Sequence, residues 1–242
     1  MGKKRILYVS QEISPYTKEN KRSNFCMNLP QFVQENDNDI RIFMPKFGTI
    51  NERRHQLHEV IRLSGMNLII DDFDHQLIIK VASVQQSRMQ VYFIDNEEYF
   101  PKRHYLNDPE GNFMQNNDER MMFFCKGVIE TVKKLGWAPD IIHCNGWFSA
   151  LVPMYIKKLY NKDPMFSNTK IYYTVFDNPF KGDLNNSLSE KLLFEDLQDK
   201  DVEMIGNPTF DNLNKFAISY SDAVVQGSKK LSKNLLNFIK NN

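Results

Sequence analysis

Cysteine is scarce in this sequence, and no stretch of it is uniformly apolar or strongly charged. The three cysteines, Cys26, Cys125 and Cys144, are far apart and form no C-x-x-C pair. Such a pattern argues against a disulfide framework or a zinc site and fits a reducing compartment, so we predict a cytoplasmic protein without a structural metal. The formal net charge of +1 gives no broad field that would attract nucleic acid or a membrane surface. No apolar run approaches the length of a membrane-spanning helix.

The composition is that of an ordinary globular protein, with 41% hydrophobic and 25% charged residues in a chain of 242. This length is enough for one sizeable core, and no repeat, low-complexity tract or linker divides it. We therefore predict a single domain over residues 1–242. The polar terminus at 240–242 favours a natural chain end, although a fragment of a longer chain is the other interpretation.

Short apolar runs alternate with segments of helical periodicity along most of the chain, which indicates a Rossmann-like, doubly wound α/β sheet of mainly parallel strands. Strands are expected at 5–10, 40–44, 140–143, 170–175 and 223–226, and helices at 25–33, 118–135, 148–159, 187–197, 210–220 and 228–239. Asp118 is the expected N-cap of the second helix. Three further strands, at 68–70, 77–84 and 89–94, are joined by short turns at 71–74 and 85–88. Turns this short predict an antiparallel excursion at one sheet edge.

The stretch from Pro139 to Trp147 combines a buried strand with a polar end. In open α/β sheets, ligands bind outside the carboxyl ends of the strands, which places His143, Asn145 and Trp147 at a candidate site. A hydrogen-bonded core position is an equally good interpretation for His143, and packing at a helix start is the simpler one for Trp147. His55 and His58 have the i, i+3 spacing of one helix face but no third ligand, so we expect a solvated helix there.

Five segments carry a resemblance to a known family. They are Ser10-x-Glu12-Ile13-x-Pro15-Tyr16-x-Lys18, Leu29-Pro30, Met44-Pro45-Lys46-Phe47-Gly48, Asn117-Asp118-Glu119-Arg120 and Pro139–Trp147. In this order and spacing they resemble the N-terminal catalytic domain of bacterial glycogen synthases and plant starch synthases. The resemblance runs from Ile6 to about Leu236. It implies one half of a GT-B architecture, in which a second Rossmann domain, missing from this sequence, would complete the enzyme.

The resemblance also implies an activity and a set of site residues. The family transfers glucose from ADP-glucose or UDP-glucose to an α-1,4-glucan with retention of configuration and without a metal or other cofactor. By matching motifs, Lys18 would bind the donor phosphate, and Asn145 stands where the family has a catalytic histidine. A solvated loop lysine is the other interpretation of Lys18, and a structural hydrogen-bond acceptor is the other interpretation of Glu12. Glu12, Tyr16, His143 and Trp147 would lie on the sugar and acceptor side. The implied partners are an α-glucan and either a chain that supplies the second domain or a homo-oligomer.

Three departures from the family pattern bear on the chemistry. The family's K-T-G-G-L becomes Lys18-Glu19-Asn20-Lys21-Arg22, so both glycines that let a diphosphate approach the backbone are replaced. The family's H-x-H-D-W becomes His143-Cys144-Asn145-Gly146-Trp147, and its T-x-H-N places Phe176 at the histidine. These departures favour a second hypothesis, a non-catalytic relative that binds glucan or regulates a full-length synthase. An isolated chain is expected to be inactive or very weakly active.

Overall fold

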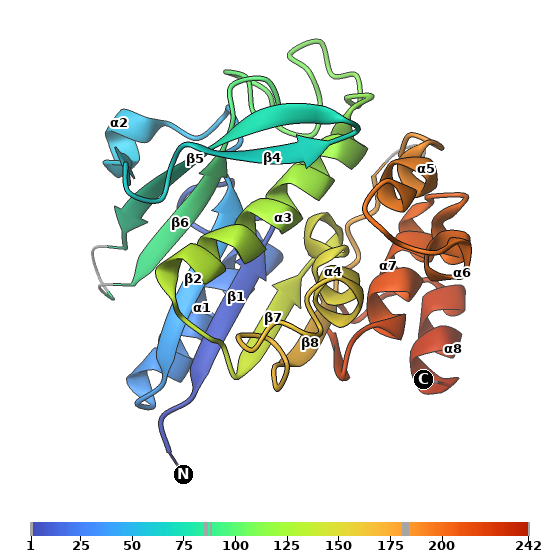
Figure 1. The fold of residues 1–242 in the computed structure, drawn as a ribbon. Helices are drawn as coiled ribbons and strands as arrows, with labels where there is room; N and C mark the ends of the chain where they lie inside the picture. The colour runs from blue at the N-terminus through green and yellow to red at the C-terminus, as the bar shows by residue number, and fades with distance from the viewer. Residues whose placement is uncertain (1, 85–86, 88, 181–183, 242) are drawn as a thin grey trace.

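A single mixed sheet forms the centre of the computed structural model, which describes residues 2–84, 87, 89–180 and 184–241 (Figure 1). The strand order is β3-β5-β6-β2-β1-β7-β8-β9, and β4 pairs with β5. The strands are β1 (Arg5–Ser10), β2 (Asp39–Pro45), β3 (His58–Glu59), β4 (Met66–Ile70), β5 (Phe73–Ser83), β6 (Gln90–Asp95), β7 (Ile141–Asn145), β8 (Lys170–Val175) and β9 (Ala223–Gln226).

The six strands from β6 to β9 in this order are parallel to their neighbours. Their apolar runs explain the arrangement, because a parallel strand is covered on both faces and has no solvent-facing side. In β1, for example, Leu7, Tyr8 and Val9 are all buried although they point alternately to the two faces. The prediction of a Rossmann-like α/β sheet is confirmed.

The antiparallel excursion is confirmed as well, with one change. β3 and β4 both pair antiparallel with β5. β6 was expected to be the third strand of this excursion; it is antiparallel to β5 but parallel to β2, and so joins the two parts of the sheet. Asp71 and Asp72, both with positive φ, form the turn between β4 and β5. Of the turn expected at 85–88, all but Ser87 lies outside the described residues.

Helices cover both faces of the sheet. In Figure 1, α3 and α4 cross the front, α1 lies behind, and α7 and α8 lie beyond β8. The helices are α1 (Lys21–Glu35), α2 (Glu52–His55), α3 (Asn117–Leu135), α4 (Val152–Lys158), α5 (Leu188–Leu193), α6 (Asp199–Val202), α7 (Phe210–Ser219) and α8 (Lys233–Asn241), with 3-10 turns η1 (Trp147–Ser149) and η2 (Glu203–Ile205). No described helix has both the length and the apolar character to cross a membrane.

Some helix bounds differ from the predictions. The helix expected at 148–159 is divided into η1 and α4, with Pro153 in the first turn of α4. The helix expected at 187–197 ends at Leu193, and Asp196 then adopts a left-handed φ of 62° that ends any helical continuation. The last helix begins at Lys233, five residues later than expected.

The start of α3 explains why the Asn117–Arg120 motif matters to the fold. The helix begins at Asn117, so Asp118 is not its N-cap; its carboxylate instead accepts a hydrogen bond from Lys191 Nζ at 2.9 Å. Arg120 is fully buried, and its guanidinium donates to the Tyr99 carbonyl and to Asn117 Oδ1. A buried guanidinium needs such partners, so the motif ties the long loop after β6 to the core.

Candidate functional site

The carboxyl ends of β1, β7 and β8 lie side by side and place three loops at one edge of the sheet. Ser10 is in register with Asn145, and Asn145 with Thr174. The loop after β1 leads into α1, the loop after β7 into η1, and the loop after β8 carries Phe176. The strand order therefore brings the β1 loop and the His143–Trp147 segment together, as the sequence predicts.

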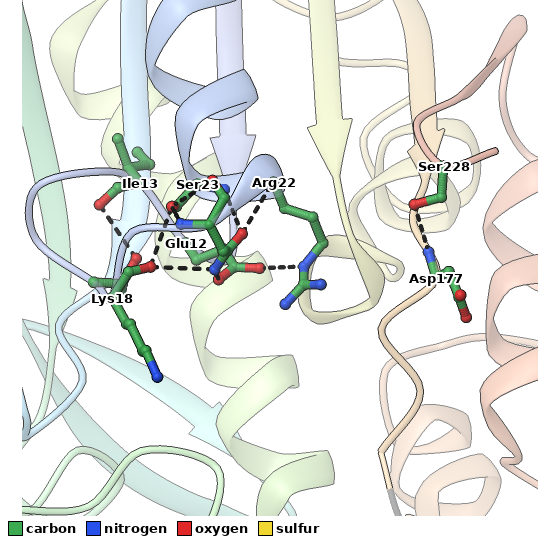
Figure 2. Close-up of polar contacts among 9 residues, drawn as sticks. Glu12, Ile13, Lys18, Arg22, Ser23, Asp177 and Ser228 are labelled. Carbon is green, nitrogen blue, oxygen red and sulfur yellow. Dashed lines mark hydrogen bonds and ion pairs between the residues drawn. The ribbon is translucent and has the colours of Figure 1, made fainter. Parts of the chain in front are cut away.

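Glu12 is buried beneath the β1 loop and is held by two side chains (Figure 2). Its Oε2 accepts a hydrogen bond from Asn20 Nδ2 at 2.8 Å, and its Oε1 forms an ion pair with Arg22 Nε at 2.5 Å. The carboxylate is thus engaged in the structure of the loop. Arg22, which could have offered compensating charge to a phosphate, is committed to this ion pair.

Asn20 closes the N-terminus of α1. Its Oδ1 accepts hydrogen bonds from the backbone amides of Arg22 at 2.8 Å and Ser23 at 3.0 Å, while Ser23 Oγ accepts from the Asn20 amide. This is a capping box, in which the side chain takes the amides that a helix N-terminus otherwise offers to an anion. Asn20, which stands where the resemblance implies a glycine, therefore already occupies the amides of Arg22 and Ser23.

Lys18 lies just before this cap, on the exposed side of the loop. Its carbonyl accepts hydrogen bonds from Asn20 Nδ2 and Ser23 Oγ, which fix the backbone. Its side chain extends away from this network in Figure 2, and its ammonium has no hydrogen-bond or ion-pair partner among the described residues. Lys18 is therefore the group of the β1 loop that is free to meet an anionic ligand.

Tyr16 belongs to a different part of the surface. It is 7% exposed, and its ring packs edge-on against His55 at 5.1 Å and Phe93 at 5.0 Å between centroids. Burial raises the pKa of its hydroxyl to about 12. The structure therefore groups Tyr16 with α2 and β6, and not with the residues of β7. The expected solvated helix at 53–58 is wrong: α2 ends at His55, and His58 lies on β3.

His143 has the environment of a core histidine. Its Nε2 is 2.7 Å from Thr174 Oγ1, and its ring packs between Tyr8 and Tyr172. Burial lowers the pKa of the imidazole to about 4, so the ring is neutral at physiological pH. Trp147 is fully buried against Phe148 and Phe180, and its indole N–H has no partner among the described residues.

The stability of the protein should fall as the pH is lowered from about 6.5 towards 4, because the unfolded chain binds a proton at His143 that the folded chain does not. An imidazole in an unfolded chain has a pKa near 6.5, so the free energy of unfolding should drop by up to about 3 kcal/mol over this window. Urea unfolding at pH 7.5 and 4.5 measures it. His143→Gln should remove this part of the loss, and His58→Gln, at an exposed position, should not. Equal losses in all three proteins would contradict the assignment.

Asn145 and Gly146 form the floor of the site. Asn145 Nδ2 donates to the His143 carbonyl at 3.1 Å, whereas its buried Oδ1 has no described partner. Gly146 has φ 82° and ψ 165°, a conformation open essentially to glycine alone. The Oε1 atom of Gln11, also without a described partner, lies 3.4 Å from the position that a Cβ at 146 would take. The resemblance did not single out Gln11; the loss of the family aspartate at 146 was the signal that could have found it.

Phe176 fills the place of the third family residue with an apolar contact. Its ring packs edge-on against Phe25 of α1 at 5.7 Å, and a Cβ at Gly227 would lie 2.5 Å from it. The loop after β8 is held further by the Asp177 amide, which donates to Ser228 Oγ at 2.9 Å (Figure 2). Phe176 is thus a packing residue that joins α1 to the end of β9.

The described residues offer no group of three or more histidine, cysteine, aspartate or glutamate side chains that could hold a metal ion. All three cysteines are buried and unpaired. Among the described residues, the groups available in the β1 loop and at the end of β7 are the Lys18 ammonium, several amides and a carboxylate that is already paired.

Comparison with known proteins decides the family. The model of the starch synthase catalytic domain matches residues 5–240, almost the whole chain. The chain belongs to the starch synthase catalytic domain family. It is 35% identical to a glycogen synthase of Chlorobium phaeobacteroides over 229 residues, which cover 91% of this chain and 47% of that protein. It is 38% identical to a glycogen synthase of Chlorobium limicola over 194 residues, or 80% and 40% of the two chains.

A solved structure shows the same fold for this member of the starch synthase family. The catalytic domain of starch synthase IV from Arabidopsis thaliana, bound to ADP and acarbose, superposes with a TM-score of 0.74 at 18% identity. The match covers 92% of this chain and 44% of that one. The chain thus spans less than half the length of these relatives and corresponds to one half of a GT-B architecture.

Proposed function

We propose that this chain is the acceptor-side half of a glucosyltransferase of the glycogen and starch synthase type. With a second Rossmann domain facing its sheet edge, it would move glucose from ADP-glucose or UDP-glucose to the non-reducing end of an α-1,4-glucan. The observation that carries the proposal is the family match over residues 5–240, within which the β1 loop leaves the Lys18 ammonium free at the carboxyl edge of the sheet.

The charge at this edge explains why the chain alone should be inert. Glycosyl transfer expels a nucleoside diphosphate and develops positive charge on the sugar, and stabilising those charges is usually the largest catalytic contribution. Lys18 supplies one positive charge, Arg22 is paired with Glu12, and His143 is neutral and hydrogen-bonded. The remaining charges would have to come from the second domain, supplied by the same longer chain or by a partner.

A second candidate function is binding of glucan without transfer. The observation that favours it is the Asn20 cap, since the two amides that would face a diphosphate already have a partner, with the Glu12 carboxylate beside them. A neutral oligosaccharide is not repelled by that carboxylate, whereas a diphosphate is. In this role the chain would bring glucan to a complete synthase or regulate one.

Isothermal titration with ADP-glucose, UDP-glucose and maltotriose separates these functions. For the transferase half we expect weak nucleotide-sugar binding that Lys18→Ala abolishes, because the ammonium is the free cation of the β1 loop. Heat from maltotriose alone, with none from either nucleotide sugar, would replace the transferase proposal with the glucan-binding one. Lys21→Ala, which removes a neighbouring exposed charge, is the matched control and should change nucleotide binding less.

A further inference from the structure

A cavity of about 470 Å³ opens beside the β1 loop, apart from the Glu12–Asn20 network. Its walls are the middle of the loop at 14–16, the outer face of α1, the last residues of α2 and the end of β5. This volume lies within the range of about 300–1,000 Å³ that small-molecule sites occupy. The cavity is built from four separate segments, and Tyr16, buried between His55 and Phe93, lines it.

Several polar side chains that line this cavity have no described hydrogen-bond partner. Neither Asn28 nor Gln56 makes a side-chain hydrogen bond to another described residue, and the guanidinium of Arg54 also has no described partner. The Gln31 amide donates to Glu35 at 2.9 Å, which fixes its orientation on the α1 face. Met27 and the Tyr16 ring add apolar surface to the lining. Amides and a guanidinium around an aromatic floor are donors and acceptors suited to a ligand rich in hydroxyl groups.

The charge of the lining narrows the class of ligand. The described lining contains no carboxylate and no lysine, and Arg54 carries its one full charge. Burial and the neighbouring Arg54 lower the pKa of His55, so its ring is neutral at pH 7 and offers one donor and one acceptor. A cation would find no counter-charge here, and a diphosphate would find a single cation. An uncharged ligand with many hydroxyl groups fits best.

We infer that this cavity is a second saccharide-binding site, separate from the sheet edge. It would hold uncharged hexose units through Asn28, Gln56 and Arg54, with Tyr16 and Met27 under the ring faces. The saccharide class follows from the lining, whereas the choice of an α-1,4-glucan as the saccharide rests on the proposed function. Tyr16, which the family pattern placed near the acceptor, then has a role in sugar binding away from β7.

Titration of the full chain with maltotriose, followed by the backbone amide signals in NMR spectra, tests the inference. We expect shifts at residues 24–31 and 54–56. The double variant Asn28→Ala/Gln56→Gly should bind maltotriose about tenfold more weakly, since two hydrogen-bonding side chains are lost. Glycine suits the left-handed φ of 52° at position 56, so the backbone should be kept, which circular dichroism verifies.

Lys18→Ala is the matched control for the sheet edge and should leave this maltotriose affinity unchanged. Unchanged binding by the double variant, or shifts confined to residues 11–20 and 143–147, would overturn the inference. Displacement of maltotriose by millimolar inorganic phosphate, abolished in Arg54→Ala, would also overturn it and make the cavity an anion site. If the double variant loses maltotriose binding while no nucleotide sugar binds, the saccharide site stands and the transferase proposal fails. If nucleotide-sugar binding depends on Lys18 and the double variant binds maltotriose normally, the transferase proposal stands and the saccharide site fails.

Discussion

Replacing Asn20 and Lys21 with glycine should raise the affinity of the chain for ADP-glucose or UDP-glucose at least tenfold. The Asn20 side chain now accepts hydrogen bonds from the amides of Arg22 and Ser23. Without it, both amides at the N-terminus of α1 become available to a phosphate, next to the free ammonium of Lys18. Hydrogen bonds to a charged group contribute about 1.5–3 kcal/mol each, so one such bond is enough for a tenfold gain.

The variant should remain folded, because replacing an N-cap residue by glycine costs only a few tenths of a kcal/mol. Asn20→Ser/Lys21→Gly is the matched control: serine keeps a side-chain cap on the same amides, so the gain should be largely lost. Adding Lys18→Ala to the glycine variant should also cancel the gain. Calorimetric titration of the four proteins measures these effects. An affinity that stays at the wild-type level in the glycine variant would mean that the phosphate site is lost for another reason.

Glu12 limits the size of that gain. In the glycine variant its carboxylate loses the hydrogen bond from Asn20 Nδ2 and keeps the ion pair with Arg22. A negative charge at the N-terminus of α1 is favourable to the helix but unfavourable to an incoming diphosphate. In the wild-type chain, the amides at the N-terminus of α1 already donate hydrogen bonds to Asn20. A nucleotide would have to displace these hydrogen bonds in order to bind there.

The parallel part of the fold could be predicted because its signals are local. The apolar runs of β1, β7 and β8 have no polar face, and α3 has an uninterrupted helical period ended by Gly136 in the left-handed conformation. The position of β6 between β5 and β2 could not be predicted, since the short turns that precede it in the sequence suggest only an antiparallel meander. Its parallel pairing with β2 arises from strand order, which depends on contacts far apart in the sequence.

The candidate site was predictable in position but not in the orientation of its side chains. Register brings Ser10 beside Asn145, as an α/β edge requires. Whether His143 faces a ligand or the core depends on Thr174 and Tyr172 of the next strand, which no local pattern reveals. The Asn20 cap did have a local signal, because asparagine is among the residues preferred at a helix N-cap.

Restoring the family aspartate at position 146 should have the opposite outcome to the glycine restoration at 20 and 21. Gly146→Asp should lower the free energy of unfolding by at least about 4 kcal/mol and should not increase sugar binding. The backbone there, at φ 82° and ψ 165°, costs a side chain about 1–3 kcal/mol. The new carboxylate would also be buried beside the side-chain Oε1 atom of Gln11, without a positive partner, and burying an unpaired charge costs several kcal/mol.

Gly146→Ala separates the two causes, since it introduces the backbone strain without the charge and should cost about 1–3 kcal/mol. Urea unfolding of both variants measures the difference. If Gly146→Asp is as stable as the wild type, the turn after β7 can adopt another conformation and the Gln11 side chain moves away from the carboxylate.

The substitutions at 20 and 21 and the substitution at 146 differ for a physical reason. Glycine at 20 and 21 removes side chains from an extended N-cap residue and from the first residue of α1, whereas aspartate at 146 adds a side chain to a turn whose conformation is open essentially to glycine alone. We therefore expect substitution to recover anion binding at the N-terminus of α1, and we expect the backbone at position 146 to exclude the aspartate.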